Sequence, residues 1–494
     1  MVKRTGALLA MAAMLASCGG DGGSGPPTAG SPPTASPSPS PSPPPTNQTC
    51  SLRARQDWVA EQLNEFYLFP DLLAQNVNPD DFSTVQAYID ALVAPARAQG
   101  RDRFFTFITS IEQENAFFAS GATAGFGIRL SIDAAAGSVT IIDAIEGAPG
   151  LAAGLDRGTE LLAIGTNMNN LRDVSEIIAS DGSGGVSAAL GPSTSGTARV
   201  LRFRDAAGNT VTSTVTKAEF DTPPISPRFG VEIFTDGGRR VGYVNLRTFI
   251  DTADDALRNA FAQFRAEGVT EVILDLRYNG GGLVSTAELF GDFLGGNRFP
   301  SDIFSFTVFR PSQSQFNETR NFAPQPQSIS PVKIAVIATS STASASELVT
   351  NAFIPYLGAD IGLIGSNTSG KPVGQIARDR AECDDRLRVV AFQVQNADRE
   401  GDYFNGLAGV MDATCRASDD FSTPLGNSGE ASIAQALSFL RGESCTPISG
   451  ATASVEGSTA RQSGQSVPVP GGVSGELLLP EAPTPAQREI PGLF

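Results

Sequence analysis

Residues 228 to about 441 alternate short apolar runs with amphipathic stretches, and this pattern constrains the fold more than any other feature of the sequence. The apolar runs have the length of buried strands, whereas the stretches between them carry apolar residues at helical spacing. Such alternation predicts βαβ units on a largely parallel sheet, with an active site at the carboxyl ends of the strands. The predicted strands include 241–246, 272–276, 334–339 and 361–364, and the predicted helices include 286–294 and 345–356.

The rest of the chain divides into segments of different composition. Residues 50–118 carry apolar residues at helical spacing and predict a small helical domain. Residues 119–217 consist of short apolar runs separated by Gly and Asn turns, which predicts a small, mostly β domain. An α/β domain then covers 218–445, and the tail 446–494 is rich in Gly, Ser, Pro and Thr, which predicts disorder. The expected fold class is a multidomain combination of α/β and α+β architecture.

Histidine is absent from the 494 residues. Its absence excludes the Ser-His-Asp triad, the Cys-His pair and every zinc site that uses imidazole. Any general base must therefore be another side chain, and Arg cannot deprotonate in proteins. Lysine is scarce, at Lys3, Lys217, Lys333 and Lys371, so few lysines could serve as that base.

The net charge is −17. A strongly acidic surface argues against nucleic acid and anionic lipid as partners, because both are negatively charged.

The N-terminus has the layout of a secretory signal over 1–17, with two basic residues before a short apolar run. The sequence Leu-Ala-Ser-Cys that ends at Cys18 resembles the lipobox of bacterial lipoproteins, which implies lipidation of Cys18. An ordinary signal peptide that contains a Cys is the alternative. Residues 18–49 are a Gly, Pro, Ser and Thr linker, for which we predict disorder. The expected location is the periplasm, at the end of a lipid anchor, with a mild preference for the outer membrane.

Four cysteines remain after Cys18, and an even number in an exported chain favours disulfides. Sequence alone leaves three pairings open. The arrangement that we favour joins Cys383 to Cys415, which share one polar stretch, and Cys50 to Cys445, which flank the folded region. A zinc site is the weaker alternative, because no CxxC pair exists.

The β domain contains a Gly-rich turn, Gly125-Phe126-Gly127-Ile128, which resembles the carboxylate-binding loop of PDZ domains. Residues 148–155 and 158–164 are similar to further PDZ stretches. Such a turn offers backbone N–H groups to a terminal carboxylate, while the adjacent strand edge pairs with the peptide. A plain hairpin turn is the alternative for the turn taken alone.

Three loops of the α/β domain follow predicted strands and carry candidate chemistry. The loop 279–282 (Asn-Gly-Gly-Gly) exposes backbone N–H groups that suit an anion or a developing oxyanion. The second loop contains Ser344 and Glu347, whose spacing before a predicted helix fits a capping box. On this interpretation both residues only cap the helix and have no catalytic role. A serine in this position can also act as a nucleophile, since the N–H of Ala345 can donate to an oxyanion.

The third loop, 365–371, satisfies G-x-x-x-x-G-K and imitates a phosphate-binding P-loop. Pro372 argues against that function, because it supplies neither a hydroxyl for magnesium nor an N–H for phosphate. Lys371 can instead serve as a base for Ser344 if burial favours its neutral form.

Together these loops resemble the C-terminal processing, or tail-specific, serine peptidases. The similar motifs are Asp-Leu-Arg-Tyr-Asn-Gly-Gly-Gly at 275–282, Thr-Ala-Ser-Ala-Ser-Glu at 342–347, and Gly370-Lys371 followed by Gln375. The resemblance implies a crotonase-like catalytic domain with a preceding PDZ domain. It also implies Ser344 as nucleophile, Lys371 as general base and Gln375 as its orienting partner. The oxyanion hole would consist of Gly280, Gly281 and Ala345. The spacing from Ser344 to Lys371 is slightly longer than usual in the family, and Pro372 replaces a common Gly.

The leading hypothesis is an endopeptidase whose PDZ domain captures substrate C-termini for cleavage by a Ser-Lys dyad, without metal or cofactor. The alternatives are a noncatalytic protein that binds peptides or apolar ligands at the cell envelope and, in third place, an ATPase. The sequence leaves the oligomeric state and the substrate open.

Overall fold

The computed structural model describes residues 48–449, 467–469 and 475–494. The predicted signal peptide, Cys18 and nearly all of the predicted linker lie outside these residues. The described residues belong to one unit, 47–494. Within the described ranges, none of the helices has the length and apolarity that a membrane-spanning helix needs.

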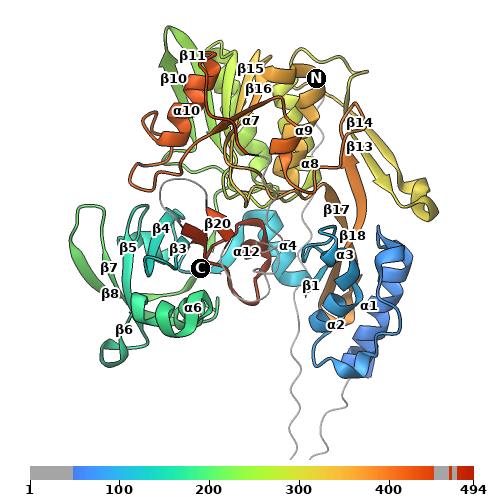
Figure 1. Ribbon diagram of the computed structural model, residues 1–494, viewed down its shortest axis with the longest axis vertical. Helices are drawn as coiled ribbons and strands as arrows, with labels where there is room; N and C mark the ends of the chain where they lie inside the picture. Colours follow the sequence, from blue (N-terminus) through green and yellow to red (C-terminus); the bar gives the residue numbers. More distant parts are fainter. Residues whose placement is uncertain (1–47, 450–466, 470–474) are drawn as a thin grey trace, which may run out of the picture. The chain divides into compact units, whose positions relative to one another are not determined.

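A six-stranded sheet forms the centre of the α/β domain (Figure 1), in the order β10-β11-β12-β15-β16-β19. Strands β11 to β19 pair in parallel, and β10 is antiparallel to β11. This arrangement agrees with the predicted βαβ units. The strands are β10 (Val231–Asp236), β11 (Arg239–Asn245), β12 (Glu271–Asp275), β15 (Lys333–Ala338), β16 (Ile361–Gly365) and β19 (Ala413–Arg416).

Helices cover both faces of this sheet. Val272 and Leu274 share a core with α7, α8 and α9, whereas Ile273 between them packs with α10. Successive side chains of a strand point to opposite faces, so one apolar run supplies both cores. The helices are α7 (Ala253–Ala266), α8 (Val284–Leu294), α9 (Ala345–Leu357) and α10 (Ala431–Leu440).

A second sheet carries the N-terminal helices. Its order is β1-β18-β13-β14, and β17 pairs with β18. The N-terminal helices pack on this sheet. They share a core with it that includes Val59, Leu63 and Ile89 of the helices and Leu387 and Val389 of β18. The elements are α1 (Leu52–Phe66), α2 (Val85–Leu92), α3 (Ala94–Ala98), α4 (Ile111–Ser120), β1 (Phe107–Ser110), β13 (Ile303–Phe309), β14 (Glu318–Asn321), β17 (Val373–Arg380) and β18 (Asp385–Gln395).

The β domain is built on an antiparallel sheet in the order β20-β21-β3-β4-β5-β7-β8, with β6 on β5. Strands β2 and β9 form a separate pair. The elements are β2 (Ala122–Gly125), β3 (Ile128–Asp133), β4 (Ser138–Ala144), α5 (Pro149–Ala152), β5 (Glu160–Gly165), β6 (Arg172–Asp173), α6 (Val174–Leu190), β7 (Ala198–Arg204), β8 (Thr210–Thr216), β9 (Ala218–Asp221), β20 (Val467–Val469) and β21 (Gly475–Leu477).

The prediction of disorder throughout 446–494 is wrong for residues 475–494. This C-terminal segment forms β21 and a short helix, α12 (Pro485–Glu489). Its apolar side chains are buried, which offsets the entropy of ordering it. They are Leu477, Leu478, Leu479, Ile490, Leu493 and Phe494.

Both favoured disulfide pairings are wrong. The structure joins Cys50 to Cys383 and Cys415 to Cys445, with Cα atoms 5.5 Å and 5.4 Å apart. Cys383 lies in a short 3-10 helix (Ala381–Cys383) between β17 and β18 of the second sheet, whereas Cys415 lies in β19 of the central sheet. Proximity along the polar stretch therefore did not indicate proximity in space.

Candidate active site

The three candidate loops meet at the carboxyl edge of the central sheet. They follow β12, β15 and β16, which are neighbours and run in parallel. Backbone hydrogen bonds join the loops: the N–H of Ala343 donates to the carbonyl of Asn279 (3.0 Å), and that of Ser369 donates to the carbonyl of Thr342 (2.9 Å). The parallel order thus brings residues from distant parts of the sequence to one site.

Ser344, the candidate nucleophile, has a strained backbone. Its φ of 56° and ψ of −115° lie outside the regions that L-residues usually adopt. The residue directly precedes α9, and Gly281 packs against it. A Cβ built on Gly281 would lie 2.7 Å from the Ser344 Cβ, and the φ of Gly281 is +121°. Only glycine allows the two loops to approach this closely.

The carboxylate of Glu347 connects the serine loop to the lysine loop. It is fully buried and accepts hydrogen bonds from the backbone N–H groups of Ser344 (3.0 Å), Gly370 (2.7 Å) and Lys371 (2.8 Å). Burial raises the pKa of the Glu347 carboxyl, while these donors oppose the rise. Sequence reasoning recognised Glu347 as a helix cap and missed this second role.

Arg103 is a second residue that sequence reasoning missed. Its buried guanidinium donates to the backbone carbonyls of Ser369 (2.5 Å), Gly370 and Phe404 (3.1 Å). Burial lowers the pKa of Arg103, and the nearby charge of Glu347 opposes that shift. Through Arg103, the helical segment 50–118 therefore holds the lysine loop in place, although the sequence of this segment carries no recognisable catalytic motif.

Lys371, the candidate base, is 9% exposed. Its Nζ donates to Oε1 of Gln375 (2.9 Å) and lies 5.1 Å from the centre of the Phe105 ring. Nε2 of Gln375 donates to the backbone carbonyl of Phe105, which fixes the amide so that its oxygen faces the lysine. The structure thus brings Lys371 and Gln375, the pair that the resemblance implied, into hydrogen-bond contact.

Pro372 is accommodated at the start of β17. Its carbonyl accepts the N–H of Val394 (2.9 Å), and a strand follows the Gly-Lys pair. A P-loop lysine instead opens a helix.

The two candidate oxyanion glycines differ in their hydrogen bonds. The N–H of Gly281 donates within its own loop, to Oδ1 of Asn279 (2.9 Å). The N–H of Gly280 donates to the carbonyl oxygen of Glu489 in the C-terminal segment (2.9 Å). Gly280 therefore donates its N–H to a peptide carbonyl outside its own loop, whereas Gly281 does not.

A buried ionic network lies behind the glycine loop. Arg277 donates to Asp275 (2.9 Å), Asp419 (3.0 Å) and Glu430 (2.8 Å). Arg157 of the β domain donates to the same Asp419 (2.9 Å). Burial alone would raise the pKa of Asp419, but the two guanidinium groups hold it below its ordinary value. The network connects the β domain to the chain segment that leads into Gly280.

The predicted carboxylate loop, residues 125–128, connects β2 to β3 in the β domain and is not part of the Ser344 cluster. The N–H groups of Gly127 and Ile128 donate to the backbone oxygen of Phe494, at 2.8 Å and 3.3 Å. Phe126 is buried in the core of the β domain.

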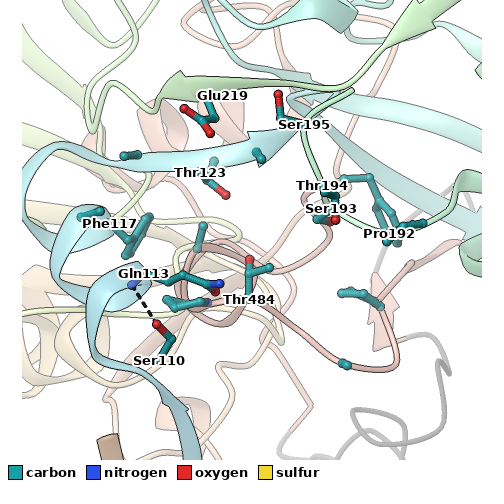
Figure 2. Close-up of a pocket in the computed structure, with 18 of the residues that line it drawn as sticks. Ser110, Gln113, Phe117, Thr123, Pro192, Ser193, Thr194, Ser195, Glu219 and Thr484 are labelled. Atoms are coloured by element: carbon teal, nitrogen blue, oxygen red, sulfur yellow. Dashed lines mark hydrogen bonds between the residues drawn. The ribbon is translucent and has the colours of Figure 1, made fainter. Parts of the chain in front are cut away.

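Two cavities border the C-terminal segment. The smaller, about 280 Å³, is lined by Lys371, Gly280 and Phe105 together with the segment. The larger, about 1270 Å³, lies among α4, β2, β9 and the loop 191–195 (Figure 2). Figure 2 shows Ser193 and Thr194 of this loop and Thr484 of the segment at its wall.

The serine, lysine and glycine loops lie together at one edge of this sheet. Residues 240–405, about a third of the chain, match the model of peptidase family S41.

Curated relatives and a solved structure carry related names. The chain is 29% identical over 283 residues to carboxyl-terminal-processing peptidase 3, chloroplastic, of Arabidopsis thaliana, covering 55% of this chain and 50% of that protein. It is 27% identical over 270 residues to the carboxyl-terminal-processing protease of a Picosynechococcus strain, covering 51% and 55%. The chain thus spans about half the length of these relatives. An S41 protease structure from Bacteroides fragilis shares the fold, with a TM-score of 0.59, 23% identity, and coverage of 78% of this chain and 97% of that one.

Proposed function

We propose that the chain is a serine endopeptidase of the C-terminal processing type that uses a Ser344–Lys371 dyad. The observation that carries the proposal is the pair of contacts around the two residues. Glu347 ties the backbone of Ser344 to that of Lys371, and Gln375 orients the lysine side chain. A peptide binder has no need of a buried lysine whose backbone is joined through one carboxylate to that of a strained serine.

In the proposed reaction, neutral Lys371 accepts the hydroxyl proton of Ser344 as Oγ attacks the scissile carbonyl carbon. The N–H groups of Gly280 and Ala345 would stabilise the oxyanion of the tetrahedral intermediate. Lys371 then donates the proton to the leaving amine, and water hydrolyses the acyl-enzyme. Because only the neutral amine can accept a proton, we expect the rate to rise from neutral to alkaline pH.

Substrate capture is proposed for the β domain. The loop at Gly127 and Ile128 and the edge of β3 would bind a substrate's C-terminus as a PDZ domain does. The crotonase-like character of the catalytic domain belongs to the same proposal, as do the lipid anchor at Cys18 and the periplasmic location.

The test uses the full chain and an unfolded, fluorescently labelled casein at neutral and alkaline pH. We expect cleavage by the wild type and its loss in Ser344→Ala and in Lys371→Ala. Lys333→Ala is the matched control, because Lys333 lies at the opposite, amino end of β15. Equal cleavage by the wild type and both active-site variants would refute the dyad. Peptide affinity without hydrolysis at any pH would favour the noncatalytic alternative.

A further inference from the structure

The C-terminal segment, residues 475–494, pairs with the edge of β3. Strand β21 is antiparallel to β3, with Leu477 opposite Ser131. The N–H of Leu478 donates to the carbonyl of Leu130, and the N–H of Leu130 donates to the carbonyl of Gly492, both at 3.0 Å. This is the edge on which a captured peptide would add as a strand. The segment therefore occupies the proposed peptide site.

Phe494 lies in the carboxylate loop itself. Its backbone oxygen accepts hydrogen bonds from Gly127 (2.8 Å) and Ile128 (3.3 Å), and its N–H donates to the carbonyl of Ile128 (2.8 Å). The phenyl ring is 2% exposed and packs in the core of the β domain. A Cβ on Gly125 would lie 2.9 Å from the carbonyl carbon of Phe494, so the loop is shaped for this close approach.

The same segment reaches the catalytic loops at Glu489. The carbonyl oxygen of Glu489 accepts the N–H of Gly280 (2.9 Å), which places it at the proposed oxyanion donor. Burial raises the pKa of the Glu489 carboxyl, and the nearby charge of Lys371 opposes that rise.

The backbone at Glu489 has the geometry of an inhibitor rather than that of a substrate. Glu489 ends helix α12, and the N–H of Ile490 donates to the carbonyl of Ala486 (2.7 Å). The nitrogen of the Glu489–Ile490 bond is thus held in a helical turn. The leaving amine must accept a proton from Lys371, which a fixed helical turn hinders.

We propose that the C-terminal segment is a built-in ligand that inhibits the peptidase in cis, blocking the carboxylate loop and the catalytic centre until it is displaced. This proposal rests on the function proposed above. The larger cavity is lined in part by Pro480, Thr484 and Phe494 of the segment, and Figure 2 shows Thr484 at its wall. Displacing the segment breaks the pairing of β21 with β3 and leaves the pairing of β3 with β4 in place.

The test compares the full chain with a chain shortened by residues 490–494, using labelled unfolded casein. A ligand held by several backbone hydrogen bonds and a buried ring should occupy the groove more than about nine-tenths of the time, so we expect kcat/KM to rise at least about tenfold on shortening. Phe494→Ala should also raise kcat/KM. This variant keeps the full chain length, so it tests the proposal even if the shortened chain misfolds. Phe299→Ala is the matched control, because Phe299 is 71% exposed.

A second measurement separates the inhibition from the chemistry. A fluorescent peptide with the sequence of residues 484–494 is titrated into the Ser344→Ala protein, full length and shortened. We expect binding to the shortened form, with at least about tenfold weaker binding to the full chain, and weaker binding of the peptide with a C-terminal amide. Equal casein rates and equal peptide binding in the two forms would overturn the proposal. If neither form cleaves casein but only the shortened form binds the peptide, the proposed function fails while the segment remains the occupant of the groove.

Discussion

Replacing Gly281 by Ala tests whether the contact between the glycine loop and Ser344 sets the geometry of the site. The new Cβ would lie 2.7 Å from the Ser344 Cβ and 3.2 Å from the N atom of Ala345, at a φ of +121°. Backbone strain of this kind costs about 1–3 kcal/mol. Overpacking in a buried site costs about 1–3 kcal/mol more. The free energy of unfolding should therefore fall by about 2–6 kcal/mol.

Activity should fall more than stability alone explains. The overlap can be relieved only by moving Ser344 or the backbone of Ala345, and a displacement of about 1 Å at a catalytic group costs about 10²-fold in rate. We expect kcat to fall by roughly that factor while KM changes little, because the three atoms nearest to the new Cβ belong to Ser344, Ala343 and Ala345 and none belongs to β3. The rate is measured with labelled casein on the shortened chain, and stability is measured by urea unfolding followed by circular dichroism.

Gly268→Ala is the matched control for this substitution. Gly268 also has a positive φ, of +66°, but a Cβ there would meet no atom within 4 Å. It therefore carries a backbone cost of about 1–2 kcal/mol without the steric contact. The reasoning is refuted if Gly281→Ala matches Gly268→Ala in both unfolding free energy and kcat.

Three further predictions concern the residues around the site. Glu347→Gln should lower kcat about tenfold and destabilise the fold by about 1–3 kcal/mol, because an amide cannot accept hydrogen bonds from all three N–H groups. Wild-type kinetics and stability in this variant would contradict the role of Glu347. Glu267→Gln, at an exposed position, is the control. Loss of the Cys415–Cys445 disulfide, which closes a loop with a sequence separation of 30, should cost about 3–4 kcal/mol in urea unfolding; an unchanged midpoint in Cys445→Ser would argue against this pairing. The pKa of Asp419 is lowered in the fold, so its contribution to stability is complete above the ordinary aspartate value and is lost as pH falls through the lowered value. Asp419→Asn should flatten this acid limb of the stability profile, and an unchanged slope would exclude the ion pairs as its cause.

The central sheet and its loops could be predicted because the signals are local. The apolar runs of β12, β15 and β16 have strand length, and parallel pairing alone places the loops that follow them at one edge. Ser344, Lys371 and the glycines could therefore be located from the sequence before any distance was known.

The contacts that complete the site could not be predicted in this way, because they join distant parts of the chain. Arg103 reaches the lysine loop across more than half of the sequence. The cysteine pairing depends on which sheet each strand joins, and the spacing of the cysteines does not report it. The average composition of the tail is typical of disordered segments. It does not report the short apolar stretches around Leu477 and Phe494, whose side chains are buried against the β domain.

The proposed inhibitor would act at two places on the peptidase. It pairs with the edge of β3 and places the backbone oxygen of Phe494 on the N–H groups of Gly127 and Ile128. It also lies against the catalytic loops, where the carbonyl of Glu489 accepts the N–H of Gly280. Both contacts belong to one segment, so a substrate that displaces Phe494 from the carboxylate loop would also uncover Gly280. The peptide-binding edge and the proposed oxyanion donor would therefore become accessible together.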